Sequence, residues 1–251
     1  MAETDKIQYD ISIVVPCYQE EGHLRKSVEV IYNLLIVTKY KFEVIFVDDC
    51  SKDKTRDVIL SIVKDFPDTQ YLFHRENMGR GGAFLEGVKL ARGKYIGFLD
   101  IDLEVSHIYL LNVISELENG SDVVIVHRHY ALAPSITFIV RHILSVGYKI
   151  LIHKYLGTPR MDTESGFKFF KRDCILNLSG QIESKRWFFD TEVMVFAHLN
   201  KYKIKEVDGL FMRNIGKTTT VKVFSDTIDY FIELFKFKKR LRKKKISAII
   251  T

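Results

Sequence analysis

Short runs of β-branched and aromatic residues recur in the first half of the chain, and each is followed by a longer segment with apolar residues at three- and four-residue spacing. The runs predict β-strands at residues 11–15, 42–47, 71–74, 95–99 and 123–126. The longer segments predict helices at residues 20–38, 55–66, 82–91 and 108–117. This alternation is typical of an α/β fold with a largely parallel central sheet flanked by helices.

The alternation stops after Arg128. The second half predicts one amphipathic segment at residues 134–156, a short strand near 166–170, a helix at 190–199 and a basic end. We therefore expect a single domain over residues 1–217, with a Rossmann-like nucleotide half at about 10–128 and an acceptor half at about 129–217. Residues 218–251 form an amphipathic, basic C-terminal segment.

The charge is unevenly distributed. The formal net charge is +6, but residues 236–245 alone contain eight Lys or Arg, so the rest of the chain is slightly acidic. A basic surface that binds nucleic acid is therefore not expected on the rest of the chain. The three cysteines, Cys17, Cys50 and Cys174, are far apart and lack metal-ligand spacing, which predicts free thiols in a reduced, cytoplasmic setting. No stretch is apolar and long enough to predict a membrane-spanning helix.

Candidate chemistry begins where the predicted strands end. Asp100 and Asp102 follow the fourth strand, two residues apart, so both side chains point to one side while the apolar Ile101 faces the other. Two convergent carboxylates can hold a hard cation such as Mg²⁺ or Mn²⁺, with water and phosphate oxygens completing its coordination. Taken alone, such a pair is also compatible with a solvated turn at the end of a strand.

Two further strand ends carry polar residues. Pro16, Tyr18 and Glu20 follow the first strand, and Asp48 and Asp49 follow the second, where open α/β sheets place their ligands. Adjacent carboxylates repel each other, so Asp48 and Asp49 are better explained as acceptors for ribose hydroxyls or a base edge than as helix caps. A glycine-dense segment containing Gly79 and Gly81 precedes a predicted helix and allows close approach to phosphate.

The segments VPCYQEE, VDDCSKDKT, NMGRGGAFLEGVKLARGKYIGFLDID and VHRHY together resemble family 2 glycosyltransferases. Further along, MDTESGFKFF, RWFFDTEV and EVDGLFMRNIGK resemble the branch that contains dolichyl-phosphate glucosyltransferases and dolichyl-phosphate mannose synthases. The resemblance implies a GT-A fold and a nucleotide diphosphate sugar as donor. It also implies that Pro16, Tyr18, Glu20 and Asp48 contact the nucleoside and that Asp100 and Asp102 bind Mg²⁺ or Mn²⁺ and the diphosphate.

The acceptor in that branch is itself a phosphate. Arginines at matching positions, which suit phosphate oxygens, are Arg128, Arg141 and Arg213, with Lys217 close to the last of them. Asp190 matches the region in which related transferases carry a catalytic carboxylate. It is needed as a base if the acceptor is a sugar hydroxyl, whereas an anionic phosphate needs little base assistance.

The sequence therefore predicts an inverting, metal-dependent hexosyltransferase that acts on a polyprenyl or dolichyl phosphate. UDP-glucose is favoured as donor, and GDP-mannose is an alternative. Other hypotheses are transfer to a glycan hydroxyl, with Asp190 as the base, and a non-catalytic module that binds a nucleotide sugar or a membrane lipid. The oligomeric state is left open by the sequence.

Two segments have the composition of a membrane-surface helix. Residues 134–156 alternate apolar and basic positions, although an ordinary core helix explains that pattern equally well. Residues 221–245 place apolar side chains before the basic run, a pattern that otherwise describes a solvated tail. With no predicted spanning helix, we expect peripheral association with the cytoplasmic face of a membrane.

Overall fold

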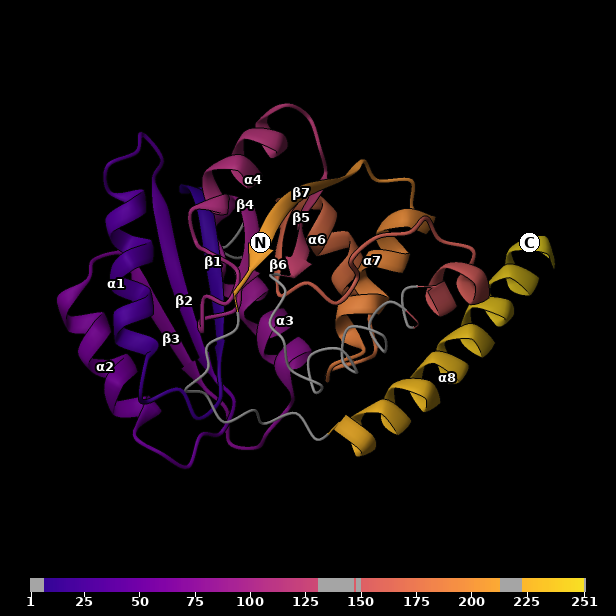
Figure 1. Ribbon diagram of the computed structural model, residues 1–251, viewed down its shortest axis with the longest axis horizontal. Coiled ribbons are helices and arrows are strands. Elements are labelled where there is room, and N and C mark those ends of the chain that lie inside the picture. Colours follow the sequence, from indigo (N-terminus) through magenta and orange to yellow (C-terminus); the bar gives the residue numbers. More distant parts are fainter. Residues whose placement is uncertain (1–6, 131–146, 148–149, 213–222, 251) are drawn as a thin grey trace.

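The computed structural model describes residues 7–130, 147, 150–212 and 223–250, with the side chains of residues 229–243 in the last segment (Figure 1). The strands are β1 (Tyr9–Cys17), β2 (Phe42–Asp48), β3 (Thr69–Phe73), β4 (Gly93–Leu99), β5 (Val123–Tyr130), β6 (Phe167–Lys171) and β7 (Ile204–Phe211). The helices are α1 (Leu24–Leu35), α2 (Thr55–Asp65), α3 (Arg80–Leu90), α4 (Tyr109–Glu118), α6 (Arg172–Ser179), α7 (Phe189–Leu199) and α8 (Val223–Ile250). All the strands and helices predicted for the first half are confirmed.

The strands form one seven-stranded sheet in the order β3-β2-β1-β4-β6-β5-β7. Every neighbouring pair is parallel except those that β6 makes with β4 and β5, which are antiparallel. Strand β6 comes from the predicted acceptor half but lies between two strands of the nucleotide half. The two halves therefore share one sheet and one pair of core layers.

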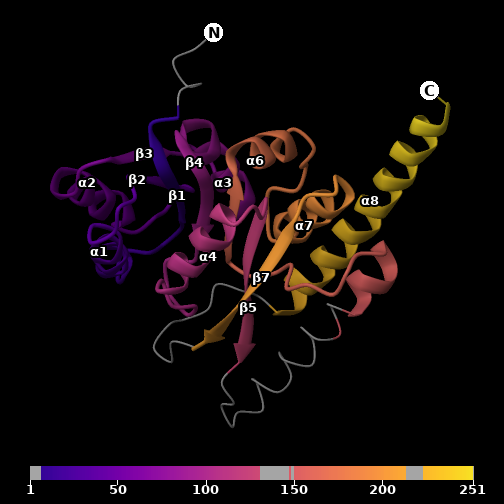
Figure 2. The same cartoon turned by 90° about the horizontal axis from the view of Figure 1, so that it is seen from above.

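Helices cover both faces of this sheet (Figure 2). Helices α1, α2 and α4 bury one core layer, and α1 shows the reason, because Leu24, Val28, Ile31 and Leu35 recur at helical spacing and are all buried. Helices α3, α6, α7 and α8 pack in the other layer, where Phe84, Phe170 and Phe189 stack. The strands between the layers are buried on both faces, as near-continuous apolar runs require.

The basic C-terminal segment is more closely joined to the body than its sequence indicates. Leu234 and Phe237 of α8 are 1% and 2% exposed, and the Phe237 ring lies 5.4 Å from that of Phe196 in α7. Arg240 contacts Glu192, a carboxylate that is 1% exposed and also accepts the backbone N–H groups of Glu183 and Ser184. Part of α8 is thus a core element of the domain.

Strand β7 and helix α6 are not predicted from the sequence. β7 lies at the sheet edge and pairs with β5 over its full length, so pairing stabilises a segment whose own pattern is weak. The predicted amphipathic segment at 134–156 falls mostly outside the described residues. Its last part, 150–156, is helical, and Ile152 packs in the core. Within the described ranges, no helix combines the length and the apolar composition needed to span a membrane.

Removing the Arg240 side chain should destabilise the domain, because Glu192 keeps its backbone donors but loses its buried counter-ion. We expect Arg240→Ala to lower the free energy of unfolding by about 2 kcal/mol, measured by urea denaturation. Arg242→Ala is the matched control, since Arg242 is an exposed arginine on the same helix and its loss should cost under about 0.5 kcal/mol. Equal effects of the two substitutions would contradict the assigned role of α8.

Candidate active site

The predicted residues that follow β1, β2 and β4 lie at the carboxyl edge of the parallel strands. The loops after β1 and β2 are tied together there, because the N–H of Gln19 donates to Ser51 Oγ at 2.9 Å and the N–H of Glu20 donates to Thr55 Oγ1 at 2.8 Å. Pro16 is half-buried at the end of β1, and Tyr18 is 37% exposed. This edge is where open α/β sheets bind ligands.

Asp48 ends β2 and is fully buried. Its carboxylate accepts the Nε–H of Arg56 at 2.7 Å and the N–H of Ser51, and Arg56 also donates to the carbonyl of His74. These protein donors hold the loop after β2 in place, and they are partners of Asp48 that the expected nucleoside contact did not include.

Asp49 also has protein partners, and they lie in the loop that leads to α3. One carboxylate oxygen accepts the N–H of Met78 at 2.7 Å and contacts His74 Nδ1 at 2.9 Å, and the other accepts the N–H of Gly79 at 2.7 Å. The residue is 3% exposed. Asp49 is therefore a positioning residue that fixes the glycine-rich loop.

The glycines of that loop make room for protein. Gly79 has φ of +83°, which favours glycine, and a Cβ there would lie 2.6 Å from the carbonyl oxygen of Lys185. Gly81 lies inside α3, where a Cβ would meet the Phe189 side chain at 2.4 Å. Protein makes the close approach at both positions, through the segment before α7 at Gly79 and through Phe189, the first residue of α7, at Gly81.

Asp100 and Asp102 follow β4, and the backbone of Gly166 lies against Asp100. The N–H of Asp100 donates to the carbonyl of Gly166 at 2.9 Å, and a Cβ on Gly166 would lie 1.7 Å from Asp100 Oδ2. The Asp100 side chain is 49% exposed, and Asp102 Oδ1 accepts the N–H of Glu104 at 3.3 Å. Ile101 between them is buried, as the strand alternation predicts.

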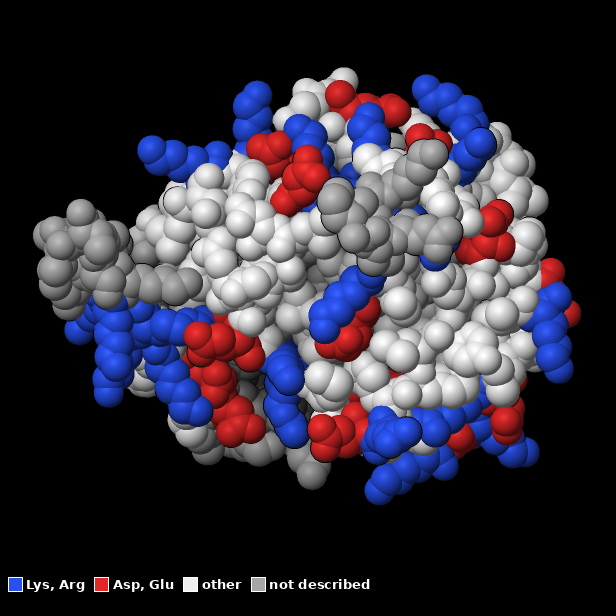
Figure 3. Space-filling model, turned by 180° about the vertical axis from the view of Figure 1, so that it is seen from behind, with Lys and Arg blue, Asp and Glu red and all other residues white. Residues whose placement is uncertain are grey.

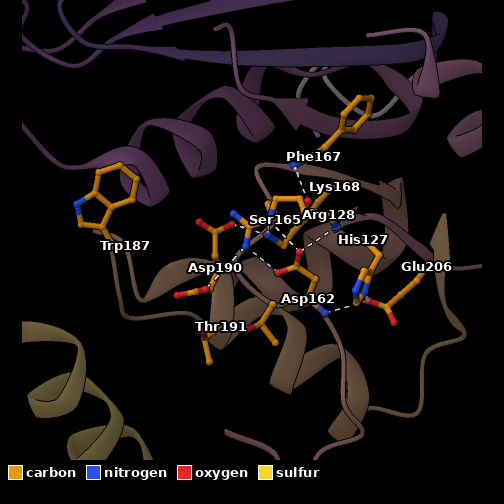
Figure 4. A network of polar contacts seen from close by, with 12 residues as sticks. His127, Arg128, Asp162, Ser165, Phe167, Lys168, Trp187, Asp190, Thr191 and Glu206 are labelled. Atoms are coloured by element: carbon orange, nitrogen blue, oxygen red, sulfur yellow. Dashed lines mark hydrogen bonds and ion pairs between the residues drawn. The ribbon is translucent and has the colours of Figure 1, made fainter. Parts of the chain in front are cut away.

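A row of alternating charges leads inward from Asp100. Arg80, the first residue of α3, places Nη2 2.7 Å from Asp100 Oδ1 and Nη1 3.4 Å from Asp190 Oδ2. The other oxygen of Asp190 accepts a hydrogen bond from Lys168 Nζ at 2.6 Å. Lys168 is fully buried on β6 and Asp190 is 2% exposed (Figure 4). Asp190 is therefore held between two cations.

Burial and neighbouring charges act on these groups in opposite directions. Desolvation lowers the pKa of Lys168, although the Asp190 carboxylate works against that shift. The pKa of Asp100 is raised, because desolvation and the carboxylates of Asp102 and Asp190 outweigh the Arg80 guanidinium. Since half of the Asp100 side chain is open to solvent, crowded negative charge contributes to this shift together with desolvation.

Arg80 has no role in the sequence analysis. One feature of the sequence pointed to it, because Arg80 lies between Gly79 and Gly81, directly before a predicted helix, and carboxylates end the next predicted strand. Sequence spacing does not show which carboxylates such a cation meets, because Asp100 and Asp190 are brought to it by β4 and α7.

Arg128 makes an ion pair that its predicted acceptor role did not include. Its Nε and Nη2 each lie 2.8 Å from a different oxygen of Asp162, a fully buried carboxylate, so the pair is bidentate (Figure 4). The Arg128 side chain is 14% exposed and lies over the Tyr130 ring. The other predicted acceptor residues, Arg141, Arg213 and Lys217, lie outside the described residues.

The donor atoms at Asp100 and Asp102 suit a divalent cation. Both offer carboxylate oxygens at an open edge, and the contact with Arg80 shows that Asp100 accepts a cation there. In the described part of the chain, no group of three His, Cys, Asp or Glu side chains is placed to hold a metal. A metal at Asp100 and Asp102 would therefore need further ligands from water or from a substrate phosphate, as Mg²⁺ commonly does.

A family model described as glycosyl transferase family 2 matches residues 12–178 of the chain. A dolichyl-phosphate beta-glucosyltransferase of Trichomonas vaginalis is 33% identical over 81% of this chain and 66% of its own length. The enzyme of the same description from Saccharomyces cerevisiae is 28% identical over 78% of this chain and 65% of its own length. The chain thus spans about two thirds of the length of these relatives.

Solved structures confirm the fold. Glucosyl-3-phosphoglycerate synthase from Mycobacterium tuberculosis, in complex with uridine diphosphate, superimposes with a TM-score of 0.70 at 15% identity, covering 92% of this chain and 80% of that one. A further structure of that enzyme, with Mn²⁺, uridine diphosphate and phosphoglyceric acid, has a TM-score of 0.64 at 16% identity, covering 92% and 78%. The GT-A fold expected from the sequence is therefore confirmed.

A methyl group on Gly166 should disturb the site, because it would overlap the Asp100 carboxylate. We expect Gly166→Ala to weaken Mn²⁺ binding by roughly ten-fold, measured by electron paramagnetic resonance of free Mn²⁺, since displacing one of two metal ligands costs at least one factor of ten. Gly180→Ala is the matched control, because a Cβ on Gly180 meets nothing within 4 Å. If Gly166→Ala binds Mn²⁺ as tightly as Gly180→Ala, Asp100 is not a ligand.

Proposed function

The chain belongs to glycosyltransferase family 2, and from this premise we propose that it transfers a hexose from a nucleotide diphosphate sugar to a polyprenyl or dolichyl phosphate. UDP-glucose is the favoured donor, because the similar proteins from Trichomonas vaginalis and Saccharomyces cerevisiae are described as dolichyl-phosphate beta-glucosyltransferases. Pro16, Tyr18 and Glu20 line the nucleoside side of the site, and Asp48 and Asp49 hold the loops that support it.

The contacts of Asp190 with Lys168 and Arg80 favour a phosphate acceptor over a hydroxyl acceptor. A sugar hydroxyl needs a base to take its proton, and Asp190 is the carboxylate that the sequence offers for this task. Its two oxygens face Lys168 and Arg80, so a proton on Asp190 would leave the buried Lys168 ammonium without its counter-ion. A phosphate acceptor is already anionic and avoids this cost.

In the proposed reaction, an oxygen of the lipid phosphate attacks the anomeric carbon from the face opposite the diphosphate. The bond between that carbon and the diphosphate oxygen breaks, its electron pair leaves with the nucleoside diphosphate, and the configuration inverts. Asp100 and Asp102 would hold Mg²⁺ or Mn²⁺, which supplies positive charge for the departing diphosphate. Arg128, Arg141, Arg213 and Lys217 are the proposed contacts of the acceptor phosphate, and the pair of Arg128 with Asp162 fixes its guanidinium in one orientation.

Replacing Asp102 tests this function directly. We expect Asp102→Asn to lower turnover of UDP-glucose by roughly a hundred-fold or more, because one metal ligand is lost at a partly exposed position. The melting temperature should change little. Excess EDTA should abolish turnover of the unmodified protein, and Mn²⁺ or Mg²⁺ should restore it. Full activity of Asp102→Asn, or full activity in EDTA, would rule out the metal role.

We also propose that α8 carries the protein to the membrane surface that holds its acceptor. Phe231, Ile232 and Phe235 are 43%, 45% and 59% exposed on this helix. Exposed cations follow on the same helix, at Lys236, Lys239, Arg242 and Lys243. Basic side chains gather at the left-hand end of the molecule in Figure 3, the end where α8 lies. Exposed aromatic residues beside cations suit an anionic leaflet, and we place this contact on the cytoplasmic side, where free thiols persist.

The outward face of α8 can be changed without touching the core. We expect Phe231→Ser combined with Ile232→Ser to weaken sedimentation with phosphatidylserine vesicles by roughly ten-fold at low salt, because the membrane contact loses two exposed apolar side chains that would insert into the lipid interface. Turnover of a water-soluble acceptor analogue should be retained. The control is Ile36→Ser with Val37→Ser, since these residues are 59% and 80% exposed at the end of α1. Equal sedimentation of both double variants would remove the membrane role from α8.

A further inference from the structure

Arg80 is a cation inside the site to which neither the family resemblance nor the proposed reaction assigns a task. Its side chain is 16% exposed, and its guanidinium carbon lies 4.9 Å from the centre of the Phe98 ring. The ring and the start of α3 fix the group between the loop after β4 and the start of α7. From there it reaches Asp100 on one side and Asp190 on the other.

The charges around Arg80 are close to balance without a metal ion. Asp100, Asp102 and Asp190 supply three negative charges, and Arg80 and Lys168 supply two positive charges. Lys168 is fully buried and is committed to Asp190, to which it donates a hydrogen bond at 2.6 Å. Arg80 is therefore the cation that balances Asp100, from a distance of 2.7 Å.

The contact between Arg80 and Asp100 is close but poorly aligned. Nη2 lies 2.7 Å from Asp100 Oδ1, yet among the described residues no acceptor makes a hydrogen bond of normal geometry to this buried nitrogen. An ion pair without an aligned hydrogen bond is held mainly by charge. A stronger cation at Asp100 can therefore replace it at small cost.

We propose that Arg80 is the internal counter-ion of the metal-free site and competes with the divalent cation for Asp100. Mg²⁺ bound by a carboxylate lies about 2.0–2.1 Å from its oxygen, and a guanidinium on the same oxygen would then repel the metal. In this proposal, metal binding displaces Arg80 from Asp100 Oδ1, while the contact of Arg80 with Asp190 remains. The proposal rests on the proposed function only in placing the metal at Asp100 and Asp102.

The competition would give Arg80 a task in both the metal-free and the donor-bound site. With Arg80 in place, the carboxylates at the strand end are not left uncompensated before the donor arrives. Once displaced, the guanidinium offers donors beside the metal, where the diphosphate oxygens of a nucleotide sugar would lie. The same side chain would then serve the metal-free and the donor-bound states.

The test measures Mn²⁺ affinity in the absence of nucleotide, by electron paramagnetic resonance of free Mn²⁺, so it does not depend on turnover. We expect Arg80→Gln to tighten Mn²⁺ binding by roughly ten-fold, because the competing charge is removed. Arg25→Gln is the matched control, since Arg25 pairs with Asp65 at the surface of α1 and α2 and its loss changes the net charge equally. It should alter the affinity by less than about two-fold, because exposed charges at a distance are screened.

Arg80→Lys covers the case in which Arg80→Gln fails to fold. Lysine keeps the charge but lacks the fork that spans two carboxylates, so its Mn²⁺ affinity should lie between those of the unmodified protein and Arg80→Gln. Unchanged or weaker binding in Arg80→Gln, or weaker binding in Arg80→Lys, would overturn the competition while leaving the proposed transferase intact. Mn²⁺ binding by Asp102→Asn that equals that of the unmodified protein would instead remove the proposed metal site, and with it the competition and the metal role in the transfer.

Discussion

The fully buried ammonium of Lys168 is the constraint around which the site is built. An ammonium taken out of water needs a counter-ion within contact distance, and Asp190 supplies it. Lys168 lies on β6, which returns from the second half of the chain and runs antiparallel to its neighbours β4 and β5. Asp190 lies in the first turn of α7. The pair therefore joins the centre of the sheet to the helix that covers it, and any acceptable placement of either element must keep the two charges together.

Close approach of backbone to side chain is the second feature on which the site depends. Gly166 lets the chain entering β6 pass close to Asp100, and Gly81 lets α3 meet Phe189 at the start of α7. Gly79 lets the glycine-rich loop meet the segment that leads into α7. That segment is held in turn by Glu192, whose carboxylate accepts two of its backbone N–H groups and contacts Arg240 of α8. A continuous set of contacts thus runs from the strand-end carboxylates to the helix that we assign to the membrane surface.

Much of the fold could be predicted from the sequence, because the strands and helices of the first half have unambiguous periods and the strand-end motifs appear in family order. The partners of Asp48 and Asp49 could not. Their repulsion argued for an open, ligand-facing pair, but Arg56 and the N–H groups of Met78 and Gly79 supply the missing donors from positions that only the folded chain brings near. The two cations that face Asp190 could not be predicted either, because they come from β6 and α3. The burial of Phe237 could not be predicted either, because this apolar residue lies within a run of Lys and Arg that is typical of a solvated segment.

The choice between a phosphate and a hydroxyl acceptor is the central claim, and a matched pair of acceptors tests it most directly. The purified chain would be incubated with radiolabelled UDP-glucose and Mn²⁺, together with either a short polyprenyl phosphate or the corresponding polyprenol, and the labelled lipid would be extracted and counted. The account predicts labelled product from the phosphate and background counts from the alcohol, because Asp190 is held by Lys168 and Arg80 and is not free to take a hydroxyl proton. Efficient glucosylation of the alcohol, with none of the phosphate, would contradict it.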